Sequence, residues 1–370
     1  MPRIALVLLV LLSSAATAST RPTRPPALGD GWAVADAAGL GWKTDLFDQA
    51  ERNIADGTWK GTTSLLVVHR GRLLYENYFN GGGREQLNDT RSLTKTVTAM
   101  LVGAAIDRGL IPNVQARVFP WFKDHPAPAN PDPRKQAITI EDLLSMSSLL
   151  ECNDDNAFSA GNEERMYVTE DWTGFALDLP IKGFPPWESK PADSPHGRSF
   201  SYCTAGSFLL GAVVERATGK HLDAFSAEVL EKPLGIERAK WNFAPDGTAM
   251  GGGGTRFRSR DLAKFGELLR NAGVWKEKTI LPKAWVSAML TVRAQAREDA
   301  DYGYQIWRFR FPYRDTEQAA WAMSGNGGNY VFIVPELELV AVITSNAYNQ
   351  RFAHPQSQGI FRDIVLKAMP

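Results

Sequence analysis

Short apolar runs bounded by turn residues occur near both ends of the chain. Runs at 64–68 and 73–79, separated by an Arg-Gly turn, predict a β-hairpin. Runs at 330–334 and 339–344, joined across a Pro-Glu pair, predict a second apolar hairpin. Strands are therefore expected at both ends of the chain.

Between these hairpins the apolar residues follow a helical spacing. The first stripe begins directly after Ser92, and Gly109 is the signal that ends it. Further helix candidates cover 142–148, 172–177, 206–218, 222–230, 260–271, the region 281–290 and a closing segment at 360–369. Two long Pro-rich loops, around 126–133 and 179–198, interrupt this part, and loops of such length usually serve a site.

Strands at both ends with helices between them predict an α/β fold. We expect one α/β domain assembled from residues 19–91 and 240–370, in which helices flank an antiparallel sheet. Residues 92–239 are expected to form an inserted, mainly helical region.

The N-terminus has the pattern of a secretory signal peptide at 1–18. Arg3 precedes an apolar run at 4–12, and the small residues Ala16 and Ala18 follow it. This run is too short for a membrane span, which needs about 20 residues. The alternative, an uncleaved amphipathic anchor, is disfavoured because Arg3 stands alone before an uncharged run. We expect a periplasmic or secreted protein that has no integral membrane segment after cleavage.

Composition and charge narrow the class of partner. Lys plus Arg and Asp plus Glu both total 41, so no net field attracts nucleic acid or an anionic membrane surface. A small, nearly neutral molecule is the expected partner. The sequence has no nucleotide-binding glycine loop and no His-Glu-x-x-His motif, so neither a cofactor nor a metal is expected. The histidines are scattered, and His196 alone is a candidate for the rim of a site.

Two cysteines, Cys152 and Cys203, belong to the part of the chain expected to be exported. An oxidising compartment favours a disulfide between them. Two buried free thiols are the alternative, because bridging depends on geometry that the sequence does not give.

A serine and a lysine at the start of the first long helix suggest nucleophilic chemistry. Lys95 is the only lysine with a serine three residues before it, and that serine, Ser92, opens the apolar stripe. The two side chains then face the same side, near the positive end of the helix dipole. An amine with a lowered pKa can take the proton of a serine hydroxyl. The alternative is a helix-capping serine followed by a surface lysine.

The stretch Arg91 to Lys95 resembles the Ser-x-x-Lys element of class C β-lactamases, serine DD-peptidases and related esterases. The stretch 200–211 is similar to the Tyr-x-Asn region of these penicillin-recognising hydrolases, with Tyr202 in place of its tyrosine. The resemblance runs from about Gly61 to the C-terminus and implies the β-lactamase/transpeptidase-like fold. It implies that Ser92 is the nucleophile, Lys95 the base and Tyr202 the proton carrier. A buried core tyrosine is the alternative for Tyr202.

The third element of that family, Lys-Thr-Gly or a His-x-Gly variant, corresponds to the stretch 324–329. The resemblance implies an oxyanion hole of the backbone N–H groups of Ser92 and Asn329, with Gly327 and Gly328 allowing close approach by substrate. A glycine-rich turn without a chemical role is the alternative. Two positions depart from the family. Thr204 replaces the asparagine of Tyr-x-Asn, and Asn326 replaces the cation of the third element. The resemblance implies that both positions, like Gly327 and Gly328, bind substrate.

These departures indicate a neutral pocket and therefore a serine hydrolase for small, uncharged esters or amides, acting through an acyl-enzyme. The chain also resembles the 6-aminohexanoate-dimer hydrolases. β-Lactam or D-peptide hydrolysis is the first alternative, and a non-catalytic binding protein with the penicillin fold is the second. Four aromatic residues are candidates for lining the acyl pocket, although each is individually more typical of packing: Trp172, Trp187, Trp307 and Tyr330.

Overall fold

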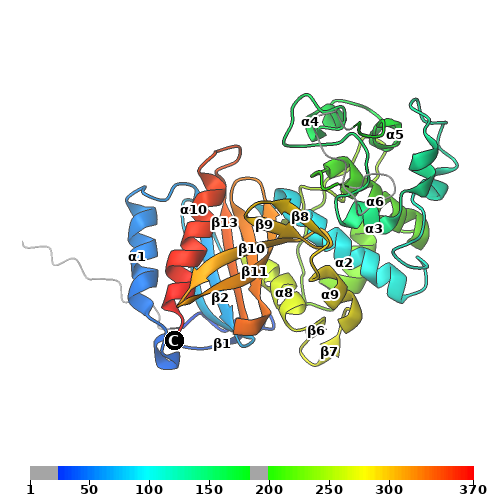
Figure 1. The fold of residues 1–370 in the computed structure, drawn as a ribbon. Helices are drawn as coiled ribbons and strands as arrows, with labels where there is room; N and C mark the ends of the chain where they lie inside the picture. The colour runs from blue at the N-terminus through cyan, green and yellow to red at the C-terminus, as the bar shows by residue number, and fades with distance from the viewer. Residues whose placement is uncertain (1–23, 184–198) are drawn as a thin grey trace, which may run out of the picture.

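The computed structural model of the chain describes residues 24–183 and 199–370. They form a nine-stranded sheet with helices on both faces, and a mainly helical region lies beside it (Figure 1). The segment 1–18 expected to be a signal peptide, together with Trp187 and His196, lies outside the described residues.

The sheet combines strands from both ends of the described chain. In spatial order they are β1 (Ala33–Val34), β3 (Arg72–Tyr78), β2 (Thr62–His69), β13 (Leu339–Ser345), β12 (Asn329–Val334), β11 (Thr316–Gly325), β10 (Trp307–Tyr313), β9 (Ala300–Tyr302) and β8 (Ala294–Arg297). Two small ribbons pair β4 (Asn88–Asp89) with β5 (Arg256–Phe257), and β6 (Val274–Trp275) with β7 (Lys278–Thr279). The expected antiparallel sheet is mixed, because β1 pairs parallel to β3.

Continuous apolar runs place the central strands in the interior. Every residue of β2, β12 and β13 is buried, as a sheet covered on both faces requires. The expected hairpin of β2 and β3 closes through Arg70 and Gly71, which both have positive φ, as a two-residue type I′ turn needs.

The helices are α1 (Thr44–Ala55), α2 (Thr94–Asp107), α3 (Ile140–Leu144), α4 (Glu163–Tyr167), α5 (Trp172–Asp178), α6 (Thr204–Thr218), α7 (Leu222–Ser226), α8 (Ser259–Arg270), α9 (Lys283–Met289) and α10 (Ala353–Ile360). A 3-10 turn, η2 (Arg91–Leu93), precedes α2, and π-helical turns follow α7 (η5, Ala227–Glu231) and α10 (η7, Phe361–Leu366). Helices α1 and α10 lie on one face of the sheet, whereas α8 packs on the other (Figure 1). Helix α6 packs against α2, α3 and α5, and so forms the centre of the helical region.

Two expected helices have different bounds in the structure. The helix expected at 142–148 is α3, which starts at Ile140 because Thr139 forms a capping box with Asp142. It stops before Met146, whose φ of 57° cannot continue a right-handed helix. The closing helix starts seven residues before the expected 360, at Ala353, and continues through η7.

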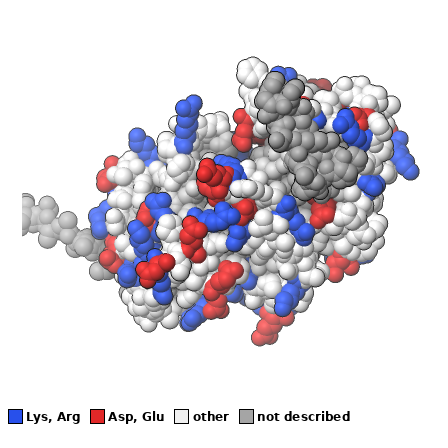
Figure 2. Space-filling view, viewed as in Figure 1, with Lys and Arg blue, Asp and Glu red and all other residues white. Residues whose placement is uncertain are grey.

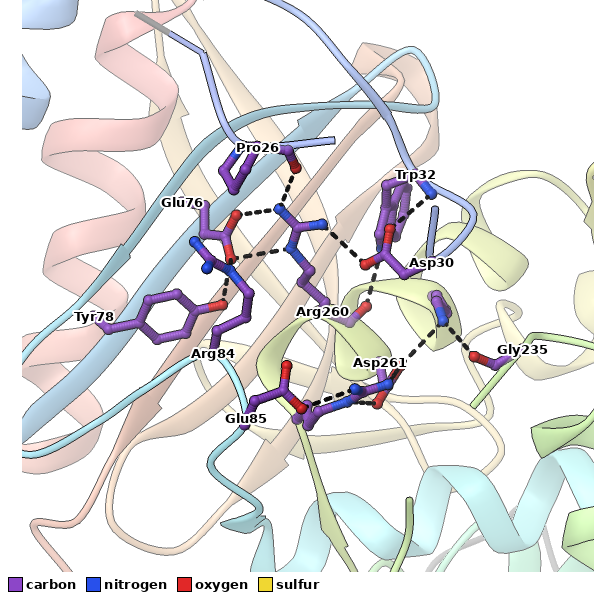
Figure 3. A network of polar contacts seen from close by, with 12 residues as sticks. Pro26, Asp30, Trp32, Glu76, Tyr78, Arg84, Glu85, Gly235, Arg260 and Asp261 are labelled. Atoms are coloured by element: carbon purple, nitrogen blue, oxygen red, sulfur yellow. Dashed lines mark hydrogen bonds and ion pairs between the residues drawn. The ribbon is translucent and has the colours of Figure 1, made fainter. Parts of the chain in front are cut away.

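A buried ionic network fixes the N-terminal segment to the body of the protein (Figure 3). The Arg260 guanidinium, on α8, donates to Asp30 Oδ2 at 2.9 Å, to the backbone oxygen of Pro26 at 2.9 Å and to both carboxylate oxygens of Glu76. The Trp32 indole N–H donates to the backbone oxygen of Arg260. One arginine therefore links the N-terminal segment, β3 and α8.

On the face shown in Figure 2, Lys and Arg side chains are interspersed with Asp and Glu side chains. None of the helices in the described ranges is both long enough and apolar enough to cross a bilayer.

Candidate active site

The turn that carries Ser92 joins β4 to α2 and has a strained backbone. Arg91 has φ 50°, a left-handed conformation that is uncommon for a residue with a side chain. Its backbone oxygen accepts hydrogen bonds from Thr94 Oγ1 and from Gly254 N–H, which hold the turn in place. The turn sets Ser92 two residues before the first residue of α2, near the positive end of the helix dipole.

Lys95 is buried behind Ser92, with 1 % of its surface exposed. Its Nζ lies 2.9 Å from Ser92 Oγ, 2.8 Å from Thr204 Oγ1 and 2.6 Å from the backbone oxygen of Gly252. Burial lowers the pKa of the Lys95 ammonium, and the negative charges of Glu163 and Asp154 partly oppose this effect. The structure thus combines the reach and the environment that a lysine base needs.

Tyr202 approaches the same hydroxyl from the helical region, two residues before α6. Its phenol is hydrogen-bonded to Ser92, and Lys95 Nζ lies 5.0 Å from the centre of its ring. Burial raises the pKa of the Tyr202 phenol well above its usual value, so the group stays protonated at neutral pH. The structure therefore brings Ser92, Lys95 and Tyr202 together.

A disulfide next to Tyr202 fixes the position of the segment that carries it. The sulfur atoms of Cys152 and Cys203 are bonded at 2.03 Å. Cys203 lies between Tyr202 and Thr204, so the bridge ties both residues to the loop that begins at Cys152. The backbone N–H of Asp154 also donates to the backbone oxygen of Tyr202 at 2.9 Å.

Thr204 differs from its expected role in substrate binding. It has no exposed surface, and its hydroxyl accepts from Lys95 Nζ. The backbone N–H of Thr204 donates to Asp154 Oδ2 at 2.7 Å, and its hydroxyl is hydrogen-bonded to the same carboxylate. Thr204 therefore lies buried behind the lysine, with no surface that a substrate could contact.

The third element meets the nucleophile turn through Gly325, at the end of β11. A Cβ atom on Gly325 would lie 2.0 Å from the backbone oxygen of Thr90 and 3.3 Å from the backbone nitrogen of Leu93. Sequence reasoning did not assign Gly325 a role. The Ser-Gly pair at the end of a strand was the available signal.

The turn after Gly325 is held by its own polar groups. Asn326 is exposed, and its side chain is bonded twice to Asn349. Asn329 is 1 % exposed, and its amide is bonded to Ser345 and to the backbone oxygen of Asn326.

Gly327 and Gly328 both have positive φ and leave no room for side chains. A Cβ atom would lie 2.8 Å from the Tyr348 ring at Gly327 and 2.5 Å from the backbone oxygen of Ala353 at Gly328. Their neighbours are therefore parts of the fold itself, and no contact with the Ser92 turn is seen for either glycine among their nearest described atoms.

The backbone of the tetraglycine segment 251–254 packs against the residues around Ser92. The backbone oxygen of Gly252 accepts from Lys95, and a Cβ atom on Gly252 would lie 2.9 Å from Thr204 Cγ2. The backbone oxygen of Gly251 accepts from Thr98 Oγ1 on α2. Glycine is needed at this segment because backbone approaches side chains closely here.

Asp154 is a second group that sequence reasoning missed. Burial raises the pKa of its carboxyl to about 6, although the positive charge of Lys95 opposes this rise. The carboxylate faces Lys95 through Thr204, and its Oδ1 accepts from the backbone N–H of Glu163. No local motif in the sequence marks this position.

Of the expected aromatic residues that the structure describes, Trp307 alone is seen to contact Tyr202. Its ring lies 5.5 Å from that of Tyr202, and the Arg297 guanidinium lies 4.6 Å from its centre. Trp172 packs on Phe208 inside the helical region. Tyr330 is buried, and its hydroxyl is bonded to His354 Nδ1 at 2.8 Å.

A mixed sheet beside a helical region, with a Ser-x-x-Lys turn and a tyrosine at their junction, defines the penicillin-recognising class of fold. The sequence matches the family described as Beta-lactamase over residues 47–358, and the chain belongs to this family. In the described residues no group of three or more His, Cys, Asp or Glu side chains is arranged to hold a metal ion.

Two named relatives match a smaller part of the chain than the family does. The 6-aminohexanoate-dimer hydrolase of Paenarthrobacter ureafaciens is 24% identical over 230 residues, which cover 62% of this chain and 57% of that protein. Esterase EstB of Burkholderia gladioli is 30% identical over 220 residues, which cover 54% of this chain and 51% of that protein. The chain thus spans little more than half the length of these relatives.

Solved structures agree with the fold. EstCE1, described as a hydrolase with promiscuous acyltransferase activity, superposes with a TM-score of 0.67 at 17% identity, covering 88% of this chain and 99% of that one. A penicillin-binding protein from Bacillus halodurans superposes with a TM-score of 0.62 at 16% identity, covering 83% and 98%. At these identities the likeness concerns the fold alone.

Proposed function

We propose that the protein is a serine hydrolase that cleaves small ester or amide substrates through an acyl-enzyme on Ser92. One observation carries this proposal. A fully buried lysine amine lies 2.9 Å from Ser92 Oγ, and a protonated phenol is bonded to the same hydroxyl. A structural lysine would have no need of this position, because burying a charge away from a carboxylate is costly.

In the proposed reaction, the neutral amine of Lys95 takes the proton of Ser92 as Oγ attacks the substrate carbonyl carbon. The carbonyl π electrons move onto oxygen and form the tetrahedral oxyanion. When this intermediate collapses, Tyr202 gives its proton to the leaving oxygen or nitrogen, and the Lys95 ammonium returns a proton to the phenolate. Water then attacks the acyl-enzyme along the same proton route and releases the acid.

We assign the oxyanion donors to backbone N–H groups at the junction of the Ser92 turn and β11. The N–H groups of Ser92 and Asn326 have no acceptor among the described residues. Asn326 directly follows Gly325, which touches the Ser92 turn. Asn329, the candidate from the sequence, is buried across the ladder from Gly325 and lies one strand farther from that turn.

The surroundings of Ser92 favour an uncharged acyl group. Lys95 is the single cation in contact with Ser92 among the described residues, and the stretch 324–329, which resembles the third element, contains no cation. The names of the relatives, an esterase and a 6-aminohexanoate-dimer hydrolase, support the same substrate class.

One observation favours a second candidate function, hydrolysis of β-lactams or D-peptides. Arg297 lies over the ring of Trp307, which contacts Tyr202, and no ion pair engages Arg297 in the described part of the chain. An arginine at the aromatic wall can bind the carboxylate that such substrates carry.

A fluorophosphonate probe tests the proposed activity. Stoichiometric labelling mapped to Ser92 by mass spectrometry is expected for the wild type, and loss of labelling for Ser92→Ala and Lys95→Met. A panel of short-chain 4-nitrophenyl esters, linear amides, a cephalosporin and a D-alanyl-D-alanine peptide then ranks the substrate classes. A folded protein that binds penicillin without being labelled would instead be a binding protein.

We also propose that the protein is exported to the periplasm or beyond. The N-terminal sequence pattern and the Cys152–Cys203 disulfide support this location, because structural disulfides persist in oxidising compartments.

A further inference from the structure

The hydrogen bonds around Lys95 leave open which way its lone pair points. An ammonium has three N–H groups, and the three neighbours of Nζ can accept all of them. A neutral amine has two N–H groups and one lone pair. Lys95 can act as a base toward Ser92 only if the lone pair faces Ser92 Oγ and the two N–H groups face the other neighbours.

One N–H group of Lys95 must face the backbone oxygen of Gly252, because a carbonyl oxygen can only accept a hydrogen bond. The Thr204 hydroxyl can either accept a hydrogen bond from the Lys95 amine or donate one to it. If it donated, the Lys95 lone pair would be used in that hydrogen bond, and Lys95 could not take the proton of Ser92. The orientation of the Thr204 hydroxyl hydrogen therefore decides whether the base faces the nucleophile.

Asp154 fixes the orientation of the Thr204 hydroxyl hydrogen. Its carboxylate accepts from the backbone N–H of Thr204 at 2.7 Å and also interacts with the Thr204 hydroxyl, toward which an ionised carboxylate can act only as an acceptor. The Thr204 hydrogen is thereby committed to Asp154, and its oxygen can only accept from Lys95. We propose that Asp154, acting through Thr204, is a positioning residue that aims the Lys95 lone pair at Ser92. This inference rests on the proposed function.

The position of Asp154 is itself well fixed. Its Oδ2 accepts from the backbone N–H of Thr204 at 2.7 Å, and its Oδ1 accepts from the backbone N–H of Glu163 at 3.1 Å. The Cys152–Cys203 disulfide joins the segment that carries Asp154 to the segment that carries Thr204. Each oxygen of this carboxylate thus has a backbone donor, as a rigid orienting group requires.

The arrangement makes the nucleophile sensitive to pH. Among the described residues, the charged or titratable groups around Asp154, Lys95 and Tyr202 are Glu163 at the start of α4, the exposed Asp155, and the three residues themselves. The pKa of Asp154 is raised to about 6. Below that pH the protonated carboxyl can donate to Thr204, whose own hydrogen is then free to turn toward Lys95.

The test measures the second-order rate constant of fluorophosphonate labelling at Ser92 as a function of pH, on the full chain. Thr204→Val keeps the shape but removes the hydroxyl, and we expect labelling at pH 7.5 to fall by about tenfold or more. Thr204→Ser, which keeps the hydroxyl, should retain most of the wild-type rate.

Asp154→Asn should lower the maximal rate and move the midpoint of the acid limb to lower pH. The sign follows because removing a negative charge makes the Lys95 ammonium easier to deprotonate, and because the group that titrates near 6 is gone. The neighbouring carboxylate Asp155 is exposed, so Asp155→Asn is the matched control and should leave the midpoint in place.

The outcomes separate the two proposals. If the wild type is not labelled at Ser92, the proposed function fails. If the wild type is labelled, the inference is overturned when Thr204→Val labels like the wild type, or when Asp154→Asn loses rate with an unmoved acid midpoint. The latter result would show that Asp154 only supports the fold.

Discussion

At the scale of single residues, the central feature is a lysine that is buried without a carboxylate in direct contact. Its nearest neighbours are a serine hydroxyl, a threonine hydroxyl and a peptide oxygen. Neutral neighbours stabilise an ammonium less than a carboxylate does, so burial lowers the pKa of Lys95. The carboxylates of Asp154 and Glu163 act from a greater distance and limit the shift.

Tyr202→Phe removes one oxygen atom and leaves the ring packing on Trp307 in place. Because the phenol is the proposed proton donor to the leaving group, kcat for ester hydrolysis should fall by about 10²- to 10⁴-fold. The thermal unfolding temperature should change little. An unchanged kcat would remove Tyr202 from the proton route.

Three residues of the candidate site could be predicted from the sequence. Ser92 and Lys95 are one turn apart where η2 leads into α2, and Tyr202 is recognisable from its neighbours. Asp154 could not be predicted, because it reaches Thr204 through tertiary structure across 50 positions of sequence. The burial of Thr204 behind Lys95 could not be predicted for the same reason.

At the scale of elements, the site depends on how closely β11 approaches the Ser92 turn. Gly325 allows this approach, and the glycines of the β11–β12 turn that follows it pack closely against Tyr348 and Ala353. The strand and the turn therefore meet backbone to backbone.

Gly325→Ala tests this contact. The new methyl group would overlap the backbone oxygen of Thr90, so β11 or the turn must shift. We expect fluorophosphonate labelling to fall by about 100-fold, because a small misplacement at a catalytic site has this effect. Gly359→Ala, at a position with nothing within 4 Å, is the control and should label normally.

The disulfide joins two segments that carry proposed functional residues. It closes a sequence separation of 51, for which chain entropy gives about 4 kcal/mol of stabilisation. Cys152→Ser should lower the unfolding free energy by about 2–5 kcal/mol and slow labelling of Ser92. Treating the wild type with a reductant should reproduce both effects, and full activity after verified reduction would contradict this role.

Several elements could not be predicted from pattern alone. Helix α1 was not expected although it is amphipathic, with Phe47, Ala50 and Ile54 on its buried side. Strands β10 and β11 were not predicted, although β10 alternates aromatic with arginine residues in the pattern of a half-buried strand. In β11 small alanine residues give no clear alternation. The buried, apolar strands β2, β12 and β13 were the clearest, because both of their faces are covered.

At the scale of the whole molecule, the Arg260 network connects the N-terminal segment to the sheet and to α8 (Figure 3). The Arg260 and Glu76 side chains are 3% and 1% exposed. Removing one partner leaves the other as an unpaired buried charge.

Arg260→Met should therefore lower the unfolding free energy by about 3–5 kcal/mol. Arg84 also contacts Glu76, but its side chain is 38% exposed, so Arg84→Met should cost about 1 kcal/mol or less. Chemical denaturation measures both, and labelling per folded molecule should be normal in both variants. Equal losses of stability would show that burial of Arg260 is not the cause.

The pairing of β2 with β13 has a consequence for biosynthesis. Val68 lies opposite Val340, so the middle of the sheet joins segments that are far apart in the sequence. Contacts between such distant segments form slowly, and the first hairpin must wait for its neighbour until β13 has been synthesised. During that interval β2 presents an open, apolar edge, and a chaperone that shields it would raise the yield of native protein.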